Sequence, residues 1–175
     1  SVVFRDRFLT GLILLSTVAT VLIMPYINLL PVFARDELGM GATGLGFLMA
    51  CSGIGSVAGA LGVAGWRKMA DTRGIQIISA LAFAVAVMAF ALTSLPVLAG
   101  VLLVASGAAS AALMSINNTV LQLKVDDAVR GRVLSIYMLT WGLLPVGQLP
   151  IGAFADEFGA PAAVFGATLL AIAWI

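Results

Sequence analysis

The chain has 175 residues, of which 62% are apolar and only 10% are charged. Soluble domains carry about 45–50% apolar and about 25% charged residues, so a soluble globule of this size could not hide so much apolar surface from water. The net charge of +1 gives no support to nucleic-acid binding, and the absence of histidine removes the commonest general base and metal ligand. The composition therefore indicates an integral membrane protein that is not an enzyme and needs no metal or cofactor.

Six apolar runs separated by short polar loops predict an all-α fold with six transmembrane helices, at residues 8–33, 44–66, 75–93, 97–123, 133–155 and 162–175. The first run would be about 39 Å long as a helix, more than the ~30 Å hydrocarbon core, so we expect it to tilt or to bend at Pro25 and Pro31. The third run alternates alanine with larger residues like a buried strand, but its length favours a helix. Because the chain begins at Ser1 and ends inside an apolar run, we expect a fragment truncated at both ends.

The basic residues predict the orientation in the membrane. If successive helices alternate in direction, eight of the nine Lys and Arg residues lie on one side, near the N-terminus and in the loops at residues 67–74 and 124–132. The other side holds Arg35 and four acids. By the positive-inside rule the side with Arg5 and Arg7 is cytoplasmic. These two arginines resemble the start of a signal peptide, but the apolar run after them is longer than the 7–15 residues of that signal.

Polar and aromatic side chains recur on single faces of the first, fourth and fifth runs, whereas the third and sixth runs carry fewer and are expected to face lipid. One interpretation is a central polar cavity, with the candidate lining residues Thr17, Met24, Asn28, Met114, Asn117, Asn118, Tyr137, Trp141 and Gln148. The other is that Asn and Thr side chains join helices by interhelical hydrogen bonds. The residues alone leave both interpretations open.

Glycines and loop charges supply two further sets of candidates. Gly55 and Gly59 form a GxxxG pattern in the second run, and Gly142 and Gly147 lie in the fifth. We expect these four glycines to allow close helix packing rather than to bind a ligand. In the cytoplasmic loop before the fifth run, Asp126, Arg130 and Arg132 are candidates for a gate held by salt bridges.

The order of motifs in residues 122–159 resembles the major facilitator superfamily of transporters. These motifs are Gln122, the acidic loop at Asp126, Arg130-Gly131-Arg132, then Gly142, Pro145, Gly147, and Gly152, Asp156, Gly159. The start of the chain, RDRFLTGLILLS, is similar to the opening of the second half of such proteins. Among them, the bacterial exporters of drugs and siderophores, the enterobactin-exporter-like group, are the most similar. The loop after the second run, GWRKMADTRG, departs from the family pattern because it lacks the aspartate that Asp156 supplies after the fifth.

The resemblance implies the C-terminal six of twelve helices, built as two inverted three-helix repeats, with substrate bound near the midplane between the two halves. In such a half the first and fourth helices line the cavity, the second and fifth form the gating interface, and the third and sixth face lipid. The implied partners are the lipid bilayer, the N-terminal half and a small-molecule substrate.

We therefore expect a secondary exporter of small amphipathic molecules in the bacterial inner membrane, driven by proton antiport through alternating access. Because no charge lies inside an apolar run, the coupling carboxylates would have to lie in the other half. A nutrient importer and a non-transporting membrane scaffold remain alternatives. An intramembrane protease would need a lysine base, and both lysines, Lys68 and Lys124, lie in loops.

Overall fold

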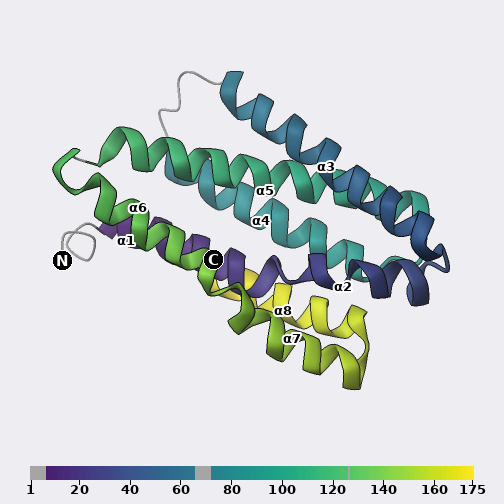
Figure 1. Cartoon of the computed structure of the whole chain (residues 1–175). Helices are drawn as coiled ribbons and strands as arrows, with labels where there is room; N and C mark the ends of the chain where they lie inside the picture. Colours follow the sequence, from purple (N-terminus) through teal and green to yellow (C-terminus); the bar gives the residue numbers. More distant parts are fainter. Residues whose placement is uncertain (1–6, 66–71, 126) are drawn as a thin grey trace.

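The computed structural model describes residues 7–65, 72–125 and 127–175, and every element in them is helical (Figure 1). Within the described residues, five helices are long and apolar enough to cross a membrane: Thr10–Glu37, Gly41–Val63, Arg73–Ala91, Pro96–Leu123 and Arg130–Phe158. A shorter apolar helix, Ala160–Trp174, follows them. These helices confirm the predicted all-α polytopic membrane fold, whereas the two inverted repeats stay a prediction.

The first span is a succession of four helical segments rather than one regular helix. They are α1 (Arg7–Val18), the π-helical segment η2 (Ala19–Ile23), α2 (Tyr26–Val32) and a second π-helical segment, η3 (Phe33–Glu37). In η2 the amide of Met24 donates to the carbonyl of Ala19, five residues earlier, at 2.9 Å. Pro25 follows at once and has no N–H to donate to the carbonyl four residues before it. The irregularity therefore lies beside the proline where the sequence predicted a bend.

The first span also continues past its apolar run, because helical hydrogen bonding extends through the charged residues of η3. The amide of Leu38 donates to the carbonyl of Phe33 at 2.9 Å. Arg35 and Asp36 form an exposed ion pair there, with 2.6 Å between Nε and Oδ1. Water and salt screen an exposed pair of this kind, so it contributes little to the stability of the span that it ends.

The remaining helices are α3 (Gly41–Gly65), α4 (Thr72–Ala91), α5 (Pro96–Lys124), the pair α6 (Asp127–Gly142) and α7 (Leu144–Phe158), and the shorter α8 (Ala160–Trp174). Pro96 begins α5, where its missing N–H costs nothing, and Leu95 before it is extended. The turn between α7 and α8 is made by Gly159, whose φ of +89° is accessible chiefly to glycine.

The fifth span is broken at Leu143, between α6 and α7. The amide of Leu143 donates to the carbonyl of Thr140, three residues earlier, at 3.1 Å. This separation is typical of a turn, whereas an α-helix joins residues four apart. Pro145 lies in the first turn of α7 and cannot donate back to α6. The apolar run at residues 133–155 did not reveal this break, because hydrophobicity continues across it.

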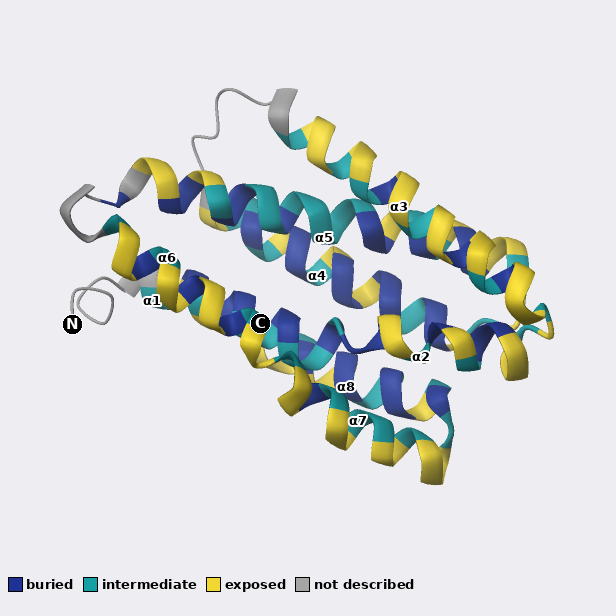
Figure 2. Cartoon of the chain, viewed as in Figure 1, coloured by how far each residue is buried: buried dark blue, intermediate teal, exposed yellow. Residues whose placement is uncertain are grey.

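Helix α3 packs along α5, and α5 packs on α4 (Figure 1). Two glycines of α3, Gly55 and Gly59, lie against the backbone of Val104 and Ala108 in α5, with no space for a Cβ at either position. Gly107 of α5 meets the backbone of α3 in the same way. The outer face of α3 is exposed along its length, as Figure 2 shows.

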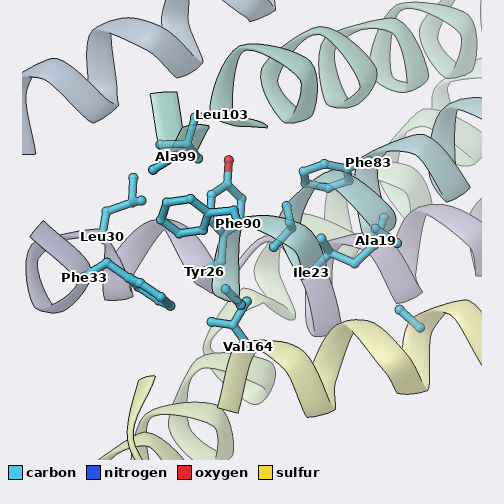
Figure 3. Close-up of a cluster of buried hydrophobic side chains, with 14 of the residues drawn as sticks. Ala19, Ile23, Tyr26, Leu30, Phe33, Phe83, Phe90, Ala99, Leu103 and Val164 are labelled. Carbon is cyan, nitrogen blue, oxygen red and sulfur yellow. The ribbon is translucent and has the colours of Figure 1, made fainter. Parts of the chain in front are cut away.

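The main apolar core lies where the first span, α4, α5 and α8 meet (Figure 3). The ring of Tyr26 packs edge-on against Phe83 at 6.1 Å and against Phe90 at 6.4 Å between ring centroids. Its hydroxyl lies 3.4 Å from the Oγ atom of Ser106 in α5. Val164 closes the core from α8.

The lipid-facing expectation for the third and sixth helices stays a prediction, and the structure shows that each of them also has a buried side. The third and sixth helices were expected to face lipid, but one side of α4 is buried, including Gln76, Ser79 and Phe83. In α8, Ala163, Thr168 and others are buried as well. The reason is that α4 and α8 pack against each other and against the first span, so only their outer sides are left to lipid.

Candidate functional site

A half-open cavity of about 30 Å³ lies between the first span, α4, α5 and α6. It has room for about one water molecule or one small functional group. The residues that line it are Ser16, Ala19, Thr20, Met24, Phe83, Ser110, Leu113, Met114, Asn117, Tyr137, Thr140 and Trp141. The wall is thus a mixture of apolar, aromatic and uncharged polar side chains.

A chain of hydrogen bonds joins three spans beside this cavity. The Nε2 atom of Gln76 in α4 donates to Oδ1 of Asn117 in α5 at 2.5 Å. The Nδ2 atom of Asn117 donates to Oγ of Ser16 in α1 at 2.8 Å. All three side chains are buried. Each of the three side chains therefore has a protein partner inside the bundle, which lowers the cost of keeping amides inside a membrane protein.

Tyr137 brings α6 to the same place. It is only 3% exposed, and it lines the cavity together with Asn117 and Trp141. The Oγ1 atom of Thr140, one turn further along α6, donates to the carbonyl of Tyr137 at 2.6 Å. Tyr137 also packs in a second apolar cluster with Leu12 and Ile116, which holds the ring in place.

The structure brings five of the nine predicted cavity residues together: Met24, Met114, Asn117, Tyr137 and Trp141 all line the cavity. The other four are not among its lining residues. Thr17 donates its hydroxyl to the carbonyl of Ile13 at 2.8 Å. Asn28 is exposed, and Asn118 and Gln148 are half-buried.

The two neighbouring asparagines of α5 differ because successive helical residues point about 100° apart. Asn117 is 2% exposed and points into the bundle, whereas Asn118 lies on the adjoining face. The sequence stripe placed Asn118 on the cavity face and Asn117 beside it. Within this six-helix unit the inward position belongs to Asn117.

Gln76 and Ser16 belong to this site, although the sequence pattern did not indicate them. Gln76 lies near the start of an apolar run and was expected to face lipid, yet it is 3% exposed and bonded to Asn117. Its amide could have indicated a buried partner, because an unpaired amide in an apolar helix is energetically costly. Only the packing of α4 on α5 identifies that partner, 41 residues away.

The predicted gating loop is only partly described. Asp126 lies outside the described residues. Arg130 is half-buried, and its Nη2 atom donates to the carbonyl of Val125 at 3.1 Å. Val125 is the C-cap residue that follows α5. A guanidinium in this position stabilises a helix C-terminus. Arg132 is exposed.

The four predicted packing glycines fall into two groups. Gly55, Gly59 and Gly147 lie against a neighbouring backbone with no space for a Cβ, Gly147 against Val21 of η2. Gly142 has no atom of the described chain within 4 Å of its Cβ position, and it ends α6 at the break.

The chain is similar to a known family of membrane proteins. Residues 7–175 match the model of the family described as transmembrane secretion effectors, within the major facilitator superfamily. The chain belongs to this family. It is an integral membrane protein, and five helices of its described part are long and apolar enough to cross a membrane.

Among curated proteins, this secretion-effector chain is 26% identical over 155 residues to the staphyloferrin A transporter of Staphylococcus aureus (strain NCTC 8325 / PS 47). The alignment covers 89% of the chain and 38% of that relative. The chain thus spans well under half of the length of the transporter it matches. No solved structure matches it.

Proposed function

We propose that the chain is the C-terminal half of a secondary active exporter of small amphipathic molecules, of the drug or siderophore type, in the bacterial inner membrane. Its membership of the secretion-effector family and its similarity to a protein named as a siderophore transporter support a role in transport rather than catalysis. Because that relative is much longer, a further half of the transporter would have to form the other wall of the substrate path.

The observation that carries the proposal is the chemistry of the cavity. Donor and acceptor groups of Asn117, Tyr137 and Trp141 lie next to the thioethers of Met24 and Met114. Methionine adapts its shape to apolar groups, and the few polar groups orient a ligand. Within the described chain, no charged side chain lines this cavity. Such a wall suits molecules with an apolar body and a few hydrogen-bonding groups better than polyhydroxy nutrients.

Alternating access is the mechanism that this half is suited to. The glycine-packed pair of α3 and α5 is a rigid unit, whereas η2 and the break at Leu143 are the irregular parts of the spans beside the cavity. Rocking of this bundle against the other half would open the cavity to each side in turn. We place the driving force in proton antiport. In the described spans the charged residues lie only near the helix ends, so the proton-carrying carboxylate belongs to the rest of the protein.

The test measures how much ethidium and how much iron-free staphyloferrin A accumulate in cells that express the whole protein, with and without a proton uncoupler. Cells that export will accumulate less of at least one compound than vector controls, and the uncoupler will abolish the difference. Higher accumulation in expressing cells would mean import. A difference that survives the uncoupler would remove proton antiport from the proposal, and equal accumulation of both compounds would overturn export.

A further inference from the structure

We propose that Thr20 of η2 is a ligand-binding residue, whose hydroxyl holds a neutral hydroxyl group of the transported molecule in the cavity. This inference rests on the proposed function, because it names the residue and the chemical group that attach an amphipathic molecule to this wall. The observation behind it is a buried hydroxyl that lines the cavity and has no hydrogen-bond partner in the described chain.

Hydroxyls of the described spans commonly donate to a carbonyl of their own helix, three or four residues earlier. Thr17 of α1 donates to the carbonyl of Ile13 at 2.8 Å. The buried hydroxyl of Thr168 in α8 donates to the carbonyl of Val164 at 2.7 Å. A bond of this kind satisfies a threonine hydroxyl within its own helix, where lipid supplies no partner.

Thr20 departs from this pattern. The residue is only 6% exposed and lines the cavity. Among the described residues its Oγ1 atom has no hydrogen-bond partner, yet protein atoms do not fully enclose it. Since the residue is buried within the bundle, the open space that Oγ1 reaches is the cavity. Ser79 of α4 is also buried without a partner in the described chain, but it does not line this cavity.

The helical segment around Thr20 is irregular as well. In η2 the amide of Met24 donates to the carbonyl of Ala19, so the hydrogen-bonded step is five residues instead of four. Short π-helical segments of this kind occur frequently at functional sites. The one threonine of η2 is thus also the threonine that reaches the cavity with its hydroxyl unused.

Three other hydroxyls of the cavity wall donate to their own helices. Those of Ser16, Ser110 and Thr140 donate to carbonyls of α1, α5 and α6 at 2.6–3.0 Å. The remaining hydroxyl of the wall is that of Tyr137 in α6. Trp141 lies one helical turn further along α6 and lines the same cavity, so an N–H donor is near that phenol. Tyr137 is the alternative that the experiment must separate from Thr20.

The cavity favours a neutral ligand group. Within the described chain no charged side chain lines it, so a carboxylate or an ammonium group would lose its hydration without meeting an opposite charge. A volume of about 30 Å³ admits one small group, and the body of the molecule stays outside. A hydroxyl both donates and accepts, as that of Thr20 does, so the two can pair in either direction.

The experiment measures binding by calorimetry to the whole protein in lipid nanodiscs, with empty nanodiscs as the blank. The probes are 1-naphthalenemethanol and 1-ethylnaphthalene, which have nearly the same shape and differ by a hydroxyl in place of a methyl group. We expect Thr20→Val to weaken binding of the alcohol about three- to tenfold, the effect of one net hydrogen bond, and to leave binding of the hydrocarbon unchanged. Thr20→Ser, which keeps the hydroxyl, will retain binding of the alcohol.

Two controls separate binding from structure. Thr168→Val removes a buried threonine hydroxyl that is bonded within α8, and it will leave binding of both probes unchanged. Thermal unfolding of Thr20→Val will match that of the wild-type protein, because the variant removes no hydrogen bond of the described chain. A lower unfolding temperature would mean that the Thr20 hydroxyl has a structural partner and would overturn the proposal.

The remaining outcomes decide against Thr20 in distinct ways. Unchanged binding of the alcohol by Thr20→Val would remove Thr20 from the site. If Tyr137→Phe weakens alcohol binding and Thr20→Val does not, the phenol is the binding group. Equal weakening of both probes by Thr20→Val would mean a change of cavity shape instead of a lost hydrogen bond, and no binding of the alcohol by the wild-type protein would overturn the subsite. Export itself is decided separately by the ethidium and siderophore measurements, which do not depend on these probes.

Discussion

Gly147 of α7 lies directly against the backbone carbonyl of Val21 in η2, with no space between them for a Cβ. This contact joins the two irregular spans of the bundle, since η2 ends at Ile23, two residues before Pro25, and α7 begins just after the break at Leu143. Helices in lipid associate through close backbone approach rather than through the hydrophobic effect, so glycine at such a point determines how near the spans can come.

Gly147→Ala will therefore destabilise the protein. The added methyl group must push α7 away from η2, and overpacking of this kind costs about 1–3 kcal/mol. The measurement is thermal or denaturant unfolding of the purified protein in detergent. Gly152→Ala is the matched control, because it lies in the same helix and has no atom within 4 Å of its Cβ position. It will be neutral or stabilising by up to about 1 kcal/mol through helix propensity. Equal effects of the two variants would contradict the close contact.

Asn117→Leu will lower stability by about 1–2 kcal/mol, because it leaves the buried Gln76 and Ser16 without the partner that each has now. The check is the unfolding free energy of Asn117→Leu, Gln76→Leu and the double variant. We expect the double variant to be less destabilised than the sum of the singles, since the second change removes an amide that the first has already orphaned. Additive effects would mean that the two amides do not interact.

Asn28→Leu and Asn118→Leu will slow export several-fold at normal expression if these residues face the substrate path between the two halves. Both lie outside the described cavity, and Asn28 is exposed on this six-helix unit, where the other half would cover it. Thr119→Val is the control, because its exposed hydroxyl bonds only the carbonyl of Ser115 in its own helix. Wild-type export by both asparagine variants would remove them from the path.

The orientation is testable by cysteine labelling in intact cells. After Cys51→Ala has removed the one cysteine of this chain, and any cysteine elsewhere in the whole protein has been replaced likewise, Glu157→Cys will react with a membrane-impermeant maleimide added from outside. Arg132→Cys will react only after the membrane is permeabilised, because eight of the nine basic residues place its side in the cytoplasm. Both native side chains are exposed, so accessibility within the protein is the same for the two sites. The reverse pattern of labelling would invert the topology.

The sequence by itself determined the class of the protein and several of the residue types that line its candidate site. Long uncharged apolar runs can be stable only in lipid, and in lipid the backbone must satisfy its own hydrogen bonds, so helices that cross the membrane follow from composition and length. Met24, Met114, Tyr137 and Trp141 were recognisable as an amphipathic set because they recur at helical spacing along runs that are otherwise aliphatic.

Only the tertiary structure decided which of these residues meet and in which direction their hydrogen bonds point. Helical spacing identifies a face but not the helix that the face packs against. The sequence therefore placed Asn118 on the cavity stripe and Asn117 beside it, and only the packing of α4 and α1 shows that Asn117 is the buried one. Gln76 has no local signal of its partner, since the bond that buries it joins residues 41 positions apart. Gly142 and Gly147 likewise share a motif, but only Gly147 has another backbone against it, because α7 and not the end of α6 meets η2.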